Sequence, residues 1–252
     1  MGGPAMLRPR ILDAVLERTA TRFLQRIHRI THRMPVRLLP IEKQRVLVVA
    51  PHPDDEVIAV GGCLALHRRA DSEITTVFVT MEPPGPDGTF VRKEEASRAA
   101  KVLGYDYRFL EVPDGRASLS EDSVARRLAD IIASVKPDVI YCPFPGDHHR
   151  DHQAAAASTG DAAVRSGYQG EIRCYEVWSN LWPNVGVDIS EVVENKRAAI
   201  ECYQSQLGTP YIDAVLGLNR YRGLKLGVKF AEGLFACGPS TFRDLCRNLA
   251  VV

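Results

Sequence analysis

The sequence lacks long apolar runs. No stretch approaches the ~20 consecutive apolar residues that a helix needs to cross a bilayer, and the N-terminus lacks the apolar centre of a signal peptide. These absences argue against a helical membrane protein and predict a soluble, cytoplasmic one. Basic and acidic residues are nearly balanced, 32 against 31, so the net charge of +1 gives no reason to expect a nucleic-acid partner.

The sequence also lacks the cysteine and glycine patterns of several binding classes. None of the six cysteines forms a C-x-x-C pair or a finger-like ligand spacing, which argues against a structural zinc module. Several cysteines lie in apolar runs, so we expect reduced thiols in the core rather than disulfides. No G-x-G-x-x-G follows the first expected strand, and a glycine-rich phosphate loop is missing, which argues against a nucleotide-binding protein.

The size of the chain suits one large domain. It has 252 residues, 45% of them hydrophobic and 25% charged, which suffices for an α/β domain with a full core. We expect this domain over residues 41–252, preceded by a helical extension over residues 1–40. Residues 1–39 carry eight arginines against only Asp13 and Glu17, so the extension is strongly basic.

The extension contains one amphipathic pattern. Apolar residues from Leu7 to about Arg33 follow a helical spacing, and Pro35 and Pro40 come after it. We expect this helix to pack on the main domain or on a second subunit, which leaves a homo-oligomer open. The alternative is a helix on a membrane surface or on another partner. An Arg-rich, acid-poor leader is also typical of an organelle transit peptide.

Short apolar strands alternate with helices along the rest of the chain. The expected strands are Val46–Ala50, Ile74–Thr80, Arg108–Val112, Asp138–Cys142, Ile172–Val177 and Gly186–Ile189. The expected helices begin near Val57 and Gln153 and span Val91–Leu103, Glu121–Val135 and Glu191–Gln204, with loops and short elements from there to Val252. This alternation predicts an α/β, Rossmann-like fold with a mainly parallel sheet and helices on both faces.

Four polar residues follow the first buried strand: His52, Asp54, Asp55 and Glu56. The prolines on either side of His52 end the strand, because they lack the N–H that a sheet needs. Ligands bind at the carboxyl ends of strands in open α/β sheets. A cap for the next helix needs only one carboxylate. A histidine and a carboxylate three residues apart can bind one divalent cation and leave the carboxylate between them free, so we favour a metal site over a cap.

A second cluster repeats this arrangement. Three of the seven histidines lie within five positions after the strand that ends at Cys142, in a proline-broken turn before an alanine-rich helix: His148, His149 and His152. The carboxyl ends of parallel strands meet at one edge of a sheet. The two clusters can therefore share one metal ion.

The motifs in these clusters resemble those of the PIG-L/LmbE-type zinc N-deacetylases. The family signature A-H-P-D-D-E is matched by residues 50–56, except that Pro51 is inserted directly before the histidine. The second motif, H-x-D-H followed by small residues, is matched by residues 149–152 and the alanines after them. Two weaker patterns, beginning at Arg92 and at Asp114, stand in the right order between the two motifs.

The resemblance implies a Rossmann-like enzyme that uses one Zn²⁺ to remove the N-acetyl group of an N-acetylglucosamine-type amino-sugar conjugate. It implies that the metal ligands are His52, Asp55 and His152. It also implies Asp54 as the general base and His149 as the group that polarises the substrate. Elementary chemistry agrees, since two histidines and one carboxylate with an open position form a catalytic zinc set. A protonated His149 can then stabilise the oxyanion.

Several neighbours have less definite roles. We expect Asp151 to orient a histidine, with a helix cap as the alternative. We expect Arg92 to bind sugar hydroxyls or a phosphate and Asp114 to accept a hydroxyl opposite it, with a surface ion pair as the alternative for each. Glu56 either hydrogen-bonds a metal ligand or caps the helix. His148 has no assigned role.

Other functions stay open beside the N-deacetylase. One is an amidase that acts on a larger acyl or thiol-conjugate amide of a sugar. Another is a non-catalytic sugar-binding member of the same fold, although we expect such a protein to have lost the base. The C-terminal half resembles the family too and suggests a sugar-binding lid, in which Trp178 and Trp182 are either core residues or platforms for a sugar ring.

Overall fold

The structure is a computed structural model that describes residues 18–19, 21–22, 36–83, 85, 90–206 and 211–249. The chain divides into two compact units, residues 1–36 and residues 37–252. Of the helix expected between Leu7 and Arg33, only residues 18, 19, 21 and 22 are described, and all four are helical. The rest of that helix lies outside the described residues. The boundary expected at residue 40 stays a prediction.

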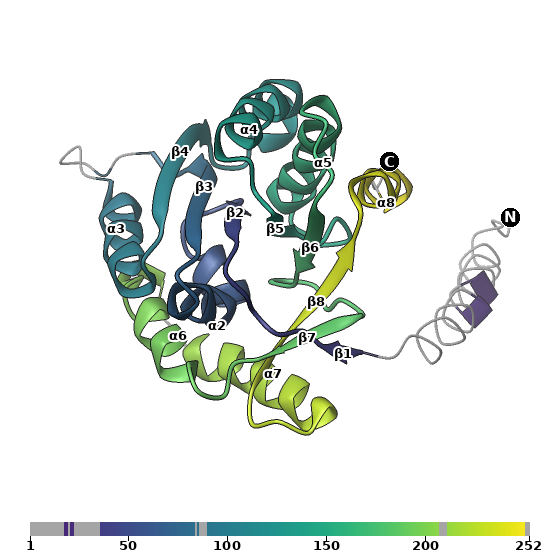
Figure 1. The fold of residues 1–252 in the computed structure, drawn as a ribbon. Coiled ribbons are helices and arrows are strands. Elements are labelled where there is room, and N and C mark those ends of the chain that lie inside the picture. The colour runs from purple at the N-terminus through teal and green to yellow at the C-terminus, as the bar shows by residue number, and fades with distance from the viewer. Residues whose placement is uncertain are drawn as a thin grey trace, which may run out of the picture. The chain divides into compact units, whose positions relative to one another are not determined.

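Within the described residues, eight strands form one sheet in the order β1-β7-β8-β6-β5-β2-β3-β4 (Figure 1). Their bounds are β1 Arg37–Leu38, β2 Arg45–Ala50, β3 Glu73–Met81, β4 Asp106–Pro113, β5 Val139–Pro143, β6 Glu171–Tyr175, β7 Val185–Asp188 and β8 Ala231–Cys237. Strand β8 runs antiparallel to both of its neighbours, and the other paired strands run parallel. The mainly parallel sheet predicted from the sequence is confirmed.

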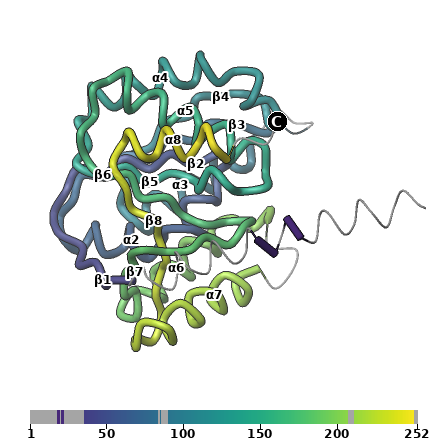
Figure 2. Tube along the Cα trace, turned by 90° about the vertical axis from the view of Figure 1, so that its right-hand side faces the viewer, coloured from purple at the N-terminus to yellow at the C-terminus, as the bar shows by residue number. Residues whose placement is uncertain are grey.

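Helices cover both faces of this sheet. Their bounds are α2 Asp55–Arg69, α3 Val91–Leu103, α4 Glu121–Val135, α5 Arg150–Arg165, α6 Val193–Ile200, α7 Tyr211–Leu226 and α8 Pro239–Leu249, with short 3₁₀ turns η1 Ala117–Ser120 and η2 Gln204–Gln206. Alternate residues of β2 enter two separate apolar cores, one with α2, α3 and α6 and one with α4, α5 and α8. Figure 2 shows α7 and α4 at opposite edges of the domain. The predicted α/β architecture is therefore confirmed.

Most of the expected elements are present, and one shifted boundary affects the site. Helix α5 begins at Arg150 and not near Gln153, because His149 forms its N-cap. Asp151 and His152 consequently lie in the first helical turn, where their side chains face the sheet edge. The helix expected to reach Gln204 ends earlier, as α6.

The C-terminal expectation was wrong. Residues after 206 were expected to form loops and short elements, whereas they include α7, β8 and α8. Gly217 and Gly223 lower the helix propensity of α7, which hid it in the sequence. Gly223 is required by packing, because a Cβ there would lie 2.8 Å from the backbone of Lys229.

Helix α2, which carries the first motif, is kinked at Val60 (φ −129°, ψ 17°). The backbone N–H groups of Gly62 and Cys63 beyond the kink donate to the carboxylate of Glu232 on β8, at 2.8 and 2.7 Å. Lys196 on α6 neutralises that carboxylate at 2.7 Å, and both side chains of the ion pair are buried. Each backbone N–H group at these two positions therefore has a hydrogen-bond partner despite the kink.

Cysteines and tryptophans lie in contrasting surroundings. All six cysteines are free thiols and four are buried, as expected. Trp178 and Trp182 are each about half exposed, so their interpretation as core residues was wrong.

Along the described part of the chain, no helix is both long enough and apolar enough to cross a membrane.

Candidate functional site

The two motif turns flank one crevice at the carboxyl edge of the sheet. Strand β2 pairs with β3 on one side and with the later β5 on the other, so the strand order reverses between β2 and β5. Helix α2 leaves β2 toward one face and α5 leaves β5 toward the other. Such a switch point opens a crevice, because the connections diverge there. The turn at residues 51–54 lies on one side of it and the turn at residues 144–149 on the other.

Asp55 joins the two turns. Its Oδ2 lies 3.2 Å from Nδ1 of His52 and 3.3 Å from Nε2 of His152, and it accepts a hydrogen bond from the backbone N–H of His52 at 2.9 Å. Donor atoms around a tetrahedral zinc ion lie about 3.3 Å apart, since the bonds are roughly 2.0–2.1 Å long. Each of these two distances therefore matches the spacing of two ligands on one zinc ion. Among the described residues, the groups whose ligand atoms all lie within 4.8 Å of one another are His52 with His149 and His152, and His52 with Asp114 and Asp151.

His152 gives an independent reason to expect a cation. It is fully buried, yet neither ring nitrogen makes a well-directed hydrogen bond to any described residue, although Asp147 lies 3.4 Å from Nδ1. Burial alone would lower the pKa of His152, but the charges of Asp55 and Asp147 raise it to about 9. Burial would also lower the pKa of His52, whereas the carboxylates around it raise it to about 12. The carboxylates thus stabilise positive charge here, which a divalent cation would supply.

Asp151 and Asp114 hold the other nitrogen of His52. Oδ2 of Asp151 lies 3.3 Å from Nε2 of His52, and its carboxylate also accepts the backbone N–H groups of Gly115 and Ala117, at 2.7 and 3.1 Å. Despite burial, these bonds lower the pKa of Asp151 to about 2. Asp114, which is partly exposed, contacts the same Nε2 at 3.1 Å. The Asp151 carboxylate therefore orients a histidine, and it does not cap its own helix.

Sequence reasoning missed Asp147. Its carboxylate lies 3.4 Å from Nδ1 of His152 and accepts the backbone N–H groups of His149 and Trp178, at 2.9 and 3.1 Å. It therefore orients His152 as Asp151 orients His52. The available signal was a carboxylate two residues before His149, in a turn whose histidines each need a partner.

His149 lies beside the two histidines expected to bind the metal: its ring centroid is 4.9 Å from that of His52 and 4.9 Å from that of His152. Its Nδ1 accepts the backbone N–H of Asp151 at 3.3 Å, which leaves a neutral ring with its proton on Nε2. Burial, followed by the charges of His152 and His52, lowers the pKa of His149. The protonated form expected from the sequence is therefore disfavoured. Nitrogen atoms of His52, His149 and His152 also lie within 4.8 Å of one another, so His149 is close enough to be a ligand.

Asp54 lies beside Asp55 but contacts neither histidine through its carboxylate. Its backbone has φ 126°, a conformation that residues with side chains rarely adopt. Burial, and next the charge of Asp55, raises the pKa of Asp54 well above its usual value. The nearest cation is Arg92, 3.9 Å away. A buried carboxylate with a raised pKa is a competent proton acceptor.

Glu56 holds Asp54 in this conformation. Its Oε2 accepts the backbone N–H of Asp54 at 3.0 Å, and its Oε1 accepts the hydroxyls of Tyr105 and Tyr203 at 2.8 and 2.6 Å. Burial raises the pKa of Glu56 to about 7. Of the two roles left open, the contacts agree with the cap, because Glu56 touches no metal-ligand candidate.

A cavity of about 430 Å³ lies against these groups. It is lined by His52, Asp54, Asp55, Arg92, Asp114, His149, Trp178, Gln206 and Tyr211. Arg92 donates to the carbonyl of Pro53 at 3.3 Å, bonds the side-chain oxygen of Gln206 and lies 3.1 Å from Glu82. Its side chain is only 12% exposed. Arg92 is therefore part of the cavity wall, whereas its partner Glu82 is 46% exposed and does not line the cavity.

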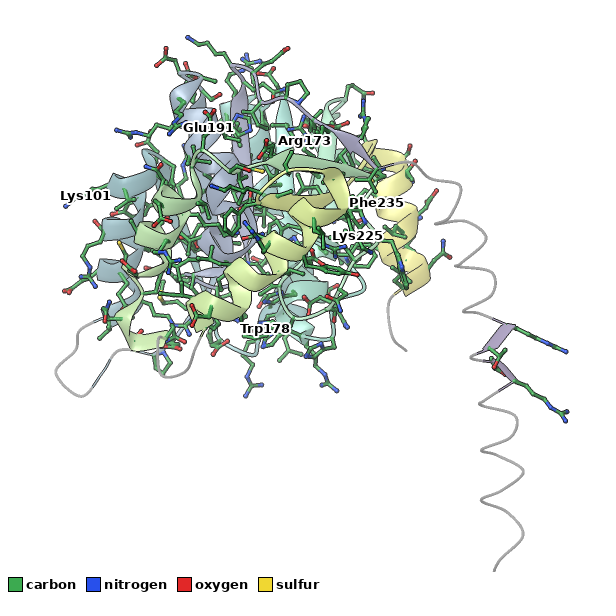
Figure 3. All side chains as sticks on the ribbon, turned by 90° about the horizontal axis from the view of Figure 1, so that it is seen from below. Lys101, Arg173, Trp178, Glu191, Lys225 and Phe235 are labelled. Carbon is green, nitrogen blue, oxygen red and sulfur yellow. The ribbon has the colours of Figure 1, made fainter. Side chains whose placement is uncertain are left out.

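The C-terminal half supplies the rest of this wall. Trp178 lies beside the start of α7 (Figure 3), with its ring centroid 6.3 Å from that of Tyr211. Tyr211 and Gln206 carried no residue-level signal, because they lie far from the motifs in sequence. His148 is exposed and bonds the hydroxyl of Ser179 at 2.9 Å, so it is not part of the cavity lining.

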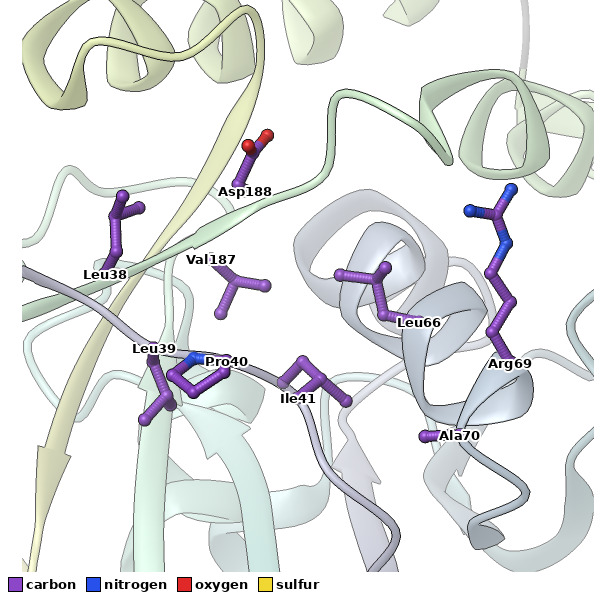
Figure 4. Close-up of a pocket in the computed structure, with 9 residues that line it drawn as sticks. All are labelled: Leu38, Leu39, Pro40, Ile41, Leu66, Arg69, Ala70, Val187 and Asp188. Carbon is purple, nitrogen blue, oxygen red and sulfur yellow. The ribbon is translucent and has the colours of Figure 1, made fainter.

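Another hollow, of about 480 Å³, lies at the far end of α2 (Figure 4). Apolar residues of segment 38–41, of the end of α2 and of β7 line it, and its charged members are Arg69 and Asp188. These two groups provide no set of metal-binding side chains. The chemistry-bearing residues gather at the opposite end of the helix.

A mainly parallel α/β sheet with two histidines and an aspartate at its switch point defines a Rossmann-like protein with a candidate metal centre. The family profile described as PIG-L, GlcNAc-PI de-N-acetylase, matches residues 47–163. The chain belongs to this family.

Three known proteins illustrate the relationship. A probable N-acetyl-alpha-D-glucosaminyl L-malate deacetylase 2 of Bacillus subtilis is 31% identical over 189 residues, which cover 65% of this chain and 84% of the relative. A 4-oxalmesaconate hydratase of Pseudomonas putida is 26% identical over 245 residues, 82% and 93% of the two chains. The crystal structure of the conserved protein TT1542 from Thermus thermophilus has a TM-score of 0.69 at 28% identity and covers 76% of this chain and 94% of its own. The relatives thus include both a deacetylase and a hydratase.

Proposed function

We propose that the chain is a metal-dependent N-deacetylase that hydrolyses the N-acetyl group of an N-acetylglucosamine-type amino-sugar conjugate. The proposed catalytic unit is residues 41–252. The observation that carries the proposal is the Asp55 oxygen shared between nitrogens of His52 and His152, with the buried Asp54 carboxylate beside it. Membership of the PIG-L family and the deacetylase relative support the reaction type.

We assign the metal to His52, Asp55 and His152. Zinc bound there would polarise the amide carbonyl and lower the pKa of a bound water towards ~7. Asp151 bonds Nε2 of His52, and Asp147 lies 3.4 Å from Nδ1 of His152, so each carboxylate faces the ring nitrogen that points away from Asp55. Such outer carboxylates also increase the basicity of the ligands.

The proton transfers are assigned to residues beside the ligands. Asp54 accepts the proton of the attacking water, because its burial and strained backbone keep a carboxylate of raised pKa next to the ligand set. Neutral His149 donates a hydrogen bond from Nε2 to the oxygen of the tetrahedral intermediate, as an oxyanion-hole donor. The amide C–N bond then breaks, and the leaving amine takes up the proton that Asp54 accepted.

The sugar is assigned to the polar side of the cavity. Arg92 and Gln206, already bonded to each other, present one guanidinium and one amide to hydroxyl groups. The partly exposed Asp114 accepts a further hydroxyl from the rim. The proposed substrate is therefore a small amino sugar or glycoconjugate.

Zinc-loaded protein assayed against a panel of N-acetylglucosamine conjugates tests the proposal. The panel contains free, phosphorylated, nucleotide-linked and inositol-linked forms, and acetate release is the readout. Release that disappears on chelation and returns with zinc is expected. Hydration of an unsaturated tricarboxylic acid without acetate release from any conjugate would favour the chemistry of the hydratase relative instead.

A further inference from the structure

A second cavity, of about 160 Å³, is lined in part by Trp178 and Tyr211. These two residues line both this cavity and the larger one that contains the proposed metal ligands. The rest of the lining is mostly apolar and includes Ile58 and Ala59 of α2 and Val215 of α7. The small cavity is therefore an apolar extension that shares a wall with the catalytic one.

Helix geometry relates this cavity to the reacting centre. Ile58 and Ala59 are three and four residues after Asp55 on α2, and residues at these spacings are neighbours on one helix face, about 5–6 Å apart at Cβ. The cavity consequently begins about one helical turn from the proposed metal ligand. Arg92 and Asp114, by contrast, line only the larger cavity.

One polar group in this lining has no partner. Asn219 is only 5% exposed, and its Nδ2 donates to the carbonyl of Ala231 at 3.2 Å. Its Oδ1 accepts no hydrogen bond from any described residue. Glu176 also lines the cavity, but Arg222 bonds both of its carboxylate oxygens, at 2.9 and 2.6 Å. The cavity therefore offers a ligand apolar walls and one free acceptor, which is costly to bury unpaired.

We propose that this cavity binds the acyl group of the scissile amide, and that the protein therefore accepts acyl groups larger than acetyl, of up to about six non-hydrogen atoms, with a hydroxyl or N–H donor for Asn219 adding affinity. The inference rests on the proposed function. The acyl group is the part of the substrate bonded to the carbonyl carbon at the metal, so it reaches a cavity one turn from Asp55, whereas the sugar stays with Arg92. A dry cavity of about 150 Å³ accommodates a benzene molecule, which sets the size.

Binding of simple amides tests the site without turnover. The protein contains two tryptophans, one of which lines the cavity, so intrinsic fluorescence can report occupancy. Hexanamide should bind at least tenfold more tightly than acetamide, because each buried methylene contributes up to about fourfold. Val215→Phe, which fills the cavity, should abolish this difference. Leu224→Phe is the matched control, since Leu224 lies on the same helix but is 78% exposed.

The role of Asn219 has its own comparison. At least one compound in a series of hydroxyhexanamides should bind more tightly than hexanamide, and Asn219→Leu should remove that gain while it keeps the preference for hexanamide over acetamide. Equal affinities for hexanamide and acetamide, or a preference that survives Val215→Phe, would overturn the proposal.

Turnover by the zinc-loaded protein shows whether the cavity binds the acyl group or the aglycone of the substrate. The readout is the ratio of N-hexanoyl to N-acetyl glucosamine hydrolysis by one preparation, which cancels any loss of folded protein. N-hexanoyl glucosamine should be hydrolysed by the unmodified protein, and the ratio should fall in Val215→Phe. Faster turnover with a phenyl aglycone, together with no hydrolysis of the hexanoyl amide, would overturn the acyl assignment. Tight hexanamide binding with no hydrolysis of any N-acyl sugar would support the cavity and refute the proposed reaction.

Discussion

Two histidines, one just before helix α2 and one in its last turn, lie in opposite electrostatic environments. At the N-terminal end, His52 lies among carboxylates that overcome the effect of burial and raise its pKa to about 12. At the C-terminal end, His67 is fully buried between the hydroxyls of Ser72 and Tyr141, at 3.1 and 3.0 Å. Burial, and next the charge of Arg173, lowers the pKa of His67 to about 3. The surroundings of His52 therefore favour its protonated ring, and those of His67 favour its neutral ring.

This difference separates a proposed metal ligand, His52, from a structural histidine, His67. His67 has a partner for each ring nitrogen, so nothing about it calls for a ligand. The opposite end gathers Asp55, Asp151 and Asp114 around His52, together with a fully buried His152 whose nitrogens lack well-directed bonds. Excess negative charge with incomplete hydrogen bonding, rather than burial alone, distinguishes the site.

The largest expected effect is loss of the metal. In His152→Ala, the protein should fall from about one zinc per chain to nearly none and lose turnover, because one of three proposed ligands is gone. Elemental analysis and acetate release measure both effects. His148→Ala is the control, since that exposed residue bonds Ser179 and should keep its zinc. A zinc-free His148→Ala beside a loaded His152→Ala would reverse the assignment.

The next prediction tests whether the two adjacent carboxylates, Asp54 and Asp55, have different roles. Asp54→Asn should keep its zinc but lower kcat by roughly 10²-fold or more, because it removes a proton acceptor and no ligand. Asp55→Asn should instead lose metal affinity. Metal content and kcat are measured on the same preparations. The general-base role would be falsified if Asp54→Asn arrived without zinc or kept full turnover.

The kink in the middle of α2 should affect stability rather than chemistry. Lys196→Met leaves the buried Glu232 carboxylate without its cation, which should lower the free energy of unfolding by about 3–5 kcal/mol. The double variant with Glu232→Gln should recover part of this loss, because the charge is then removed. Urea denaturation measures both. Zinc per folded chain should stay the same, and a loss of zinc in the folded fraction would mean that the kink also shapes the metal site.

The smallest effect concerns pH at the far end of α2. The folded-state pKa of His67 is depressed to about 3, so unfolded chains bind more protons as the pH falls below about 6.5. This group should therefore cost about 2 kcal/mol of stability between pH 7 and pH 5. His67→Gln should show a shallower dependence of unfolding free energy on pH over that interval, with both proteins zinc-loaded. An unchanged slope would show that His67 does not stay neutral in the fold.

The fold could be predicted where local patterns were strong. Strands such as β2 are continuous apolar runs, and α3 has both helical spacing and a terminal Gly104 in the left-handed conformation, so each was recognised from a few neighbouring residues. Helix α7 was missed because two interior glycines weaken its signal. Strand β8 was missed because Glu232 interrupts its apolar pattern, and only Lys196 on α6 explains a buried charge there.

The candidate site, like the fold, could be predicted only in part from the sequence. The sequence alone determined the chemistry-bearing residues, since His52, Asp54 and Asp55 form one strand–turn–helix unit and His149 to His152 another. Short segments encode these residue types and spacings, because the geometry of each strand–turn–helix unit is local. Only the tertiary structure decided how these units meet, because the contact of His52 with Asp151 spans 99 positions and requires β2 and β5 to pair. It also decided the contacts of Asp147 with Trp178 and of Glu56 with Tyr105 and Tyr203, and the walls from Trp178, Gln206 and Tyr211, because contacts between distant segments leave no pattern in either one.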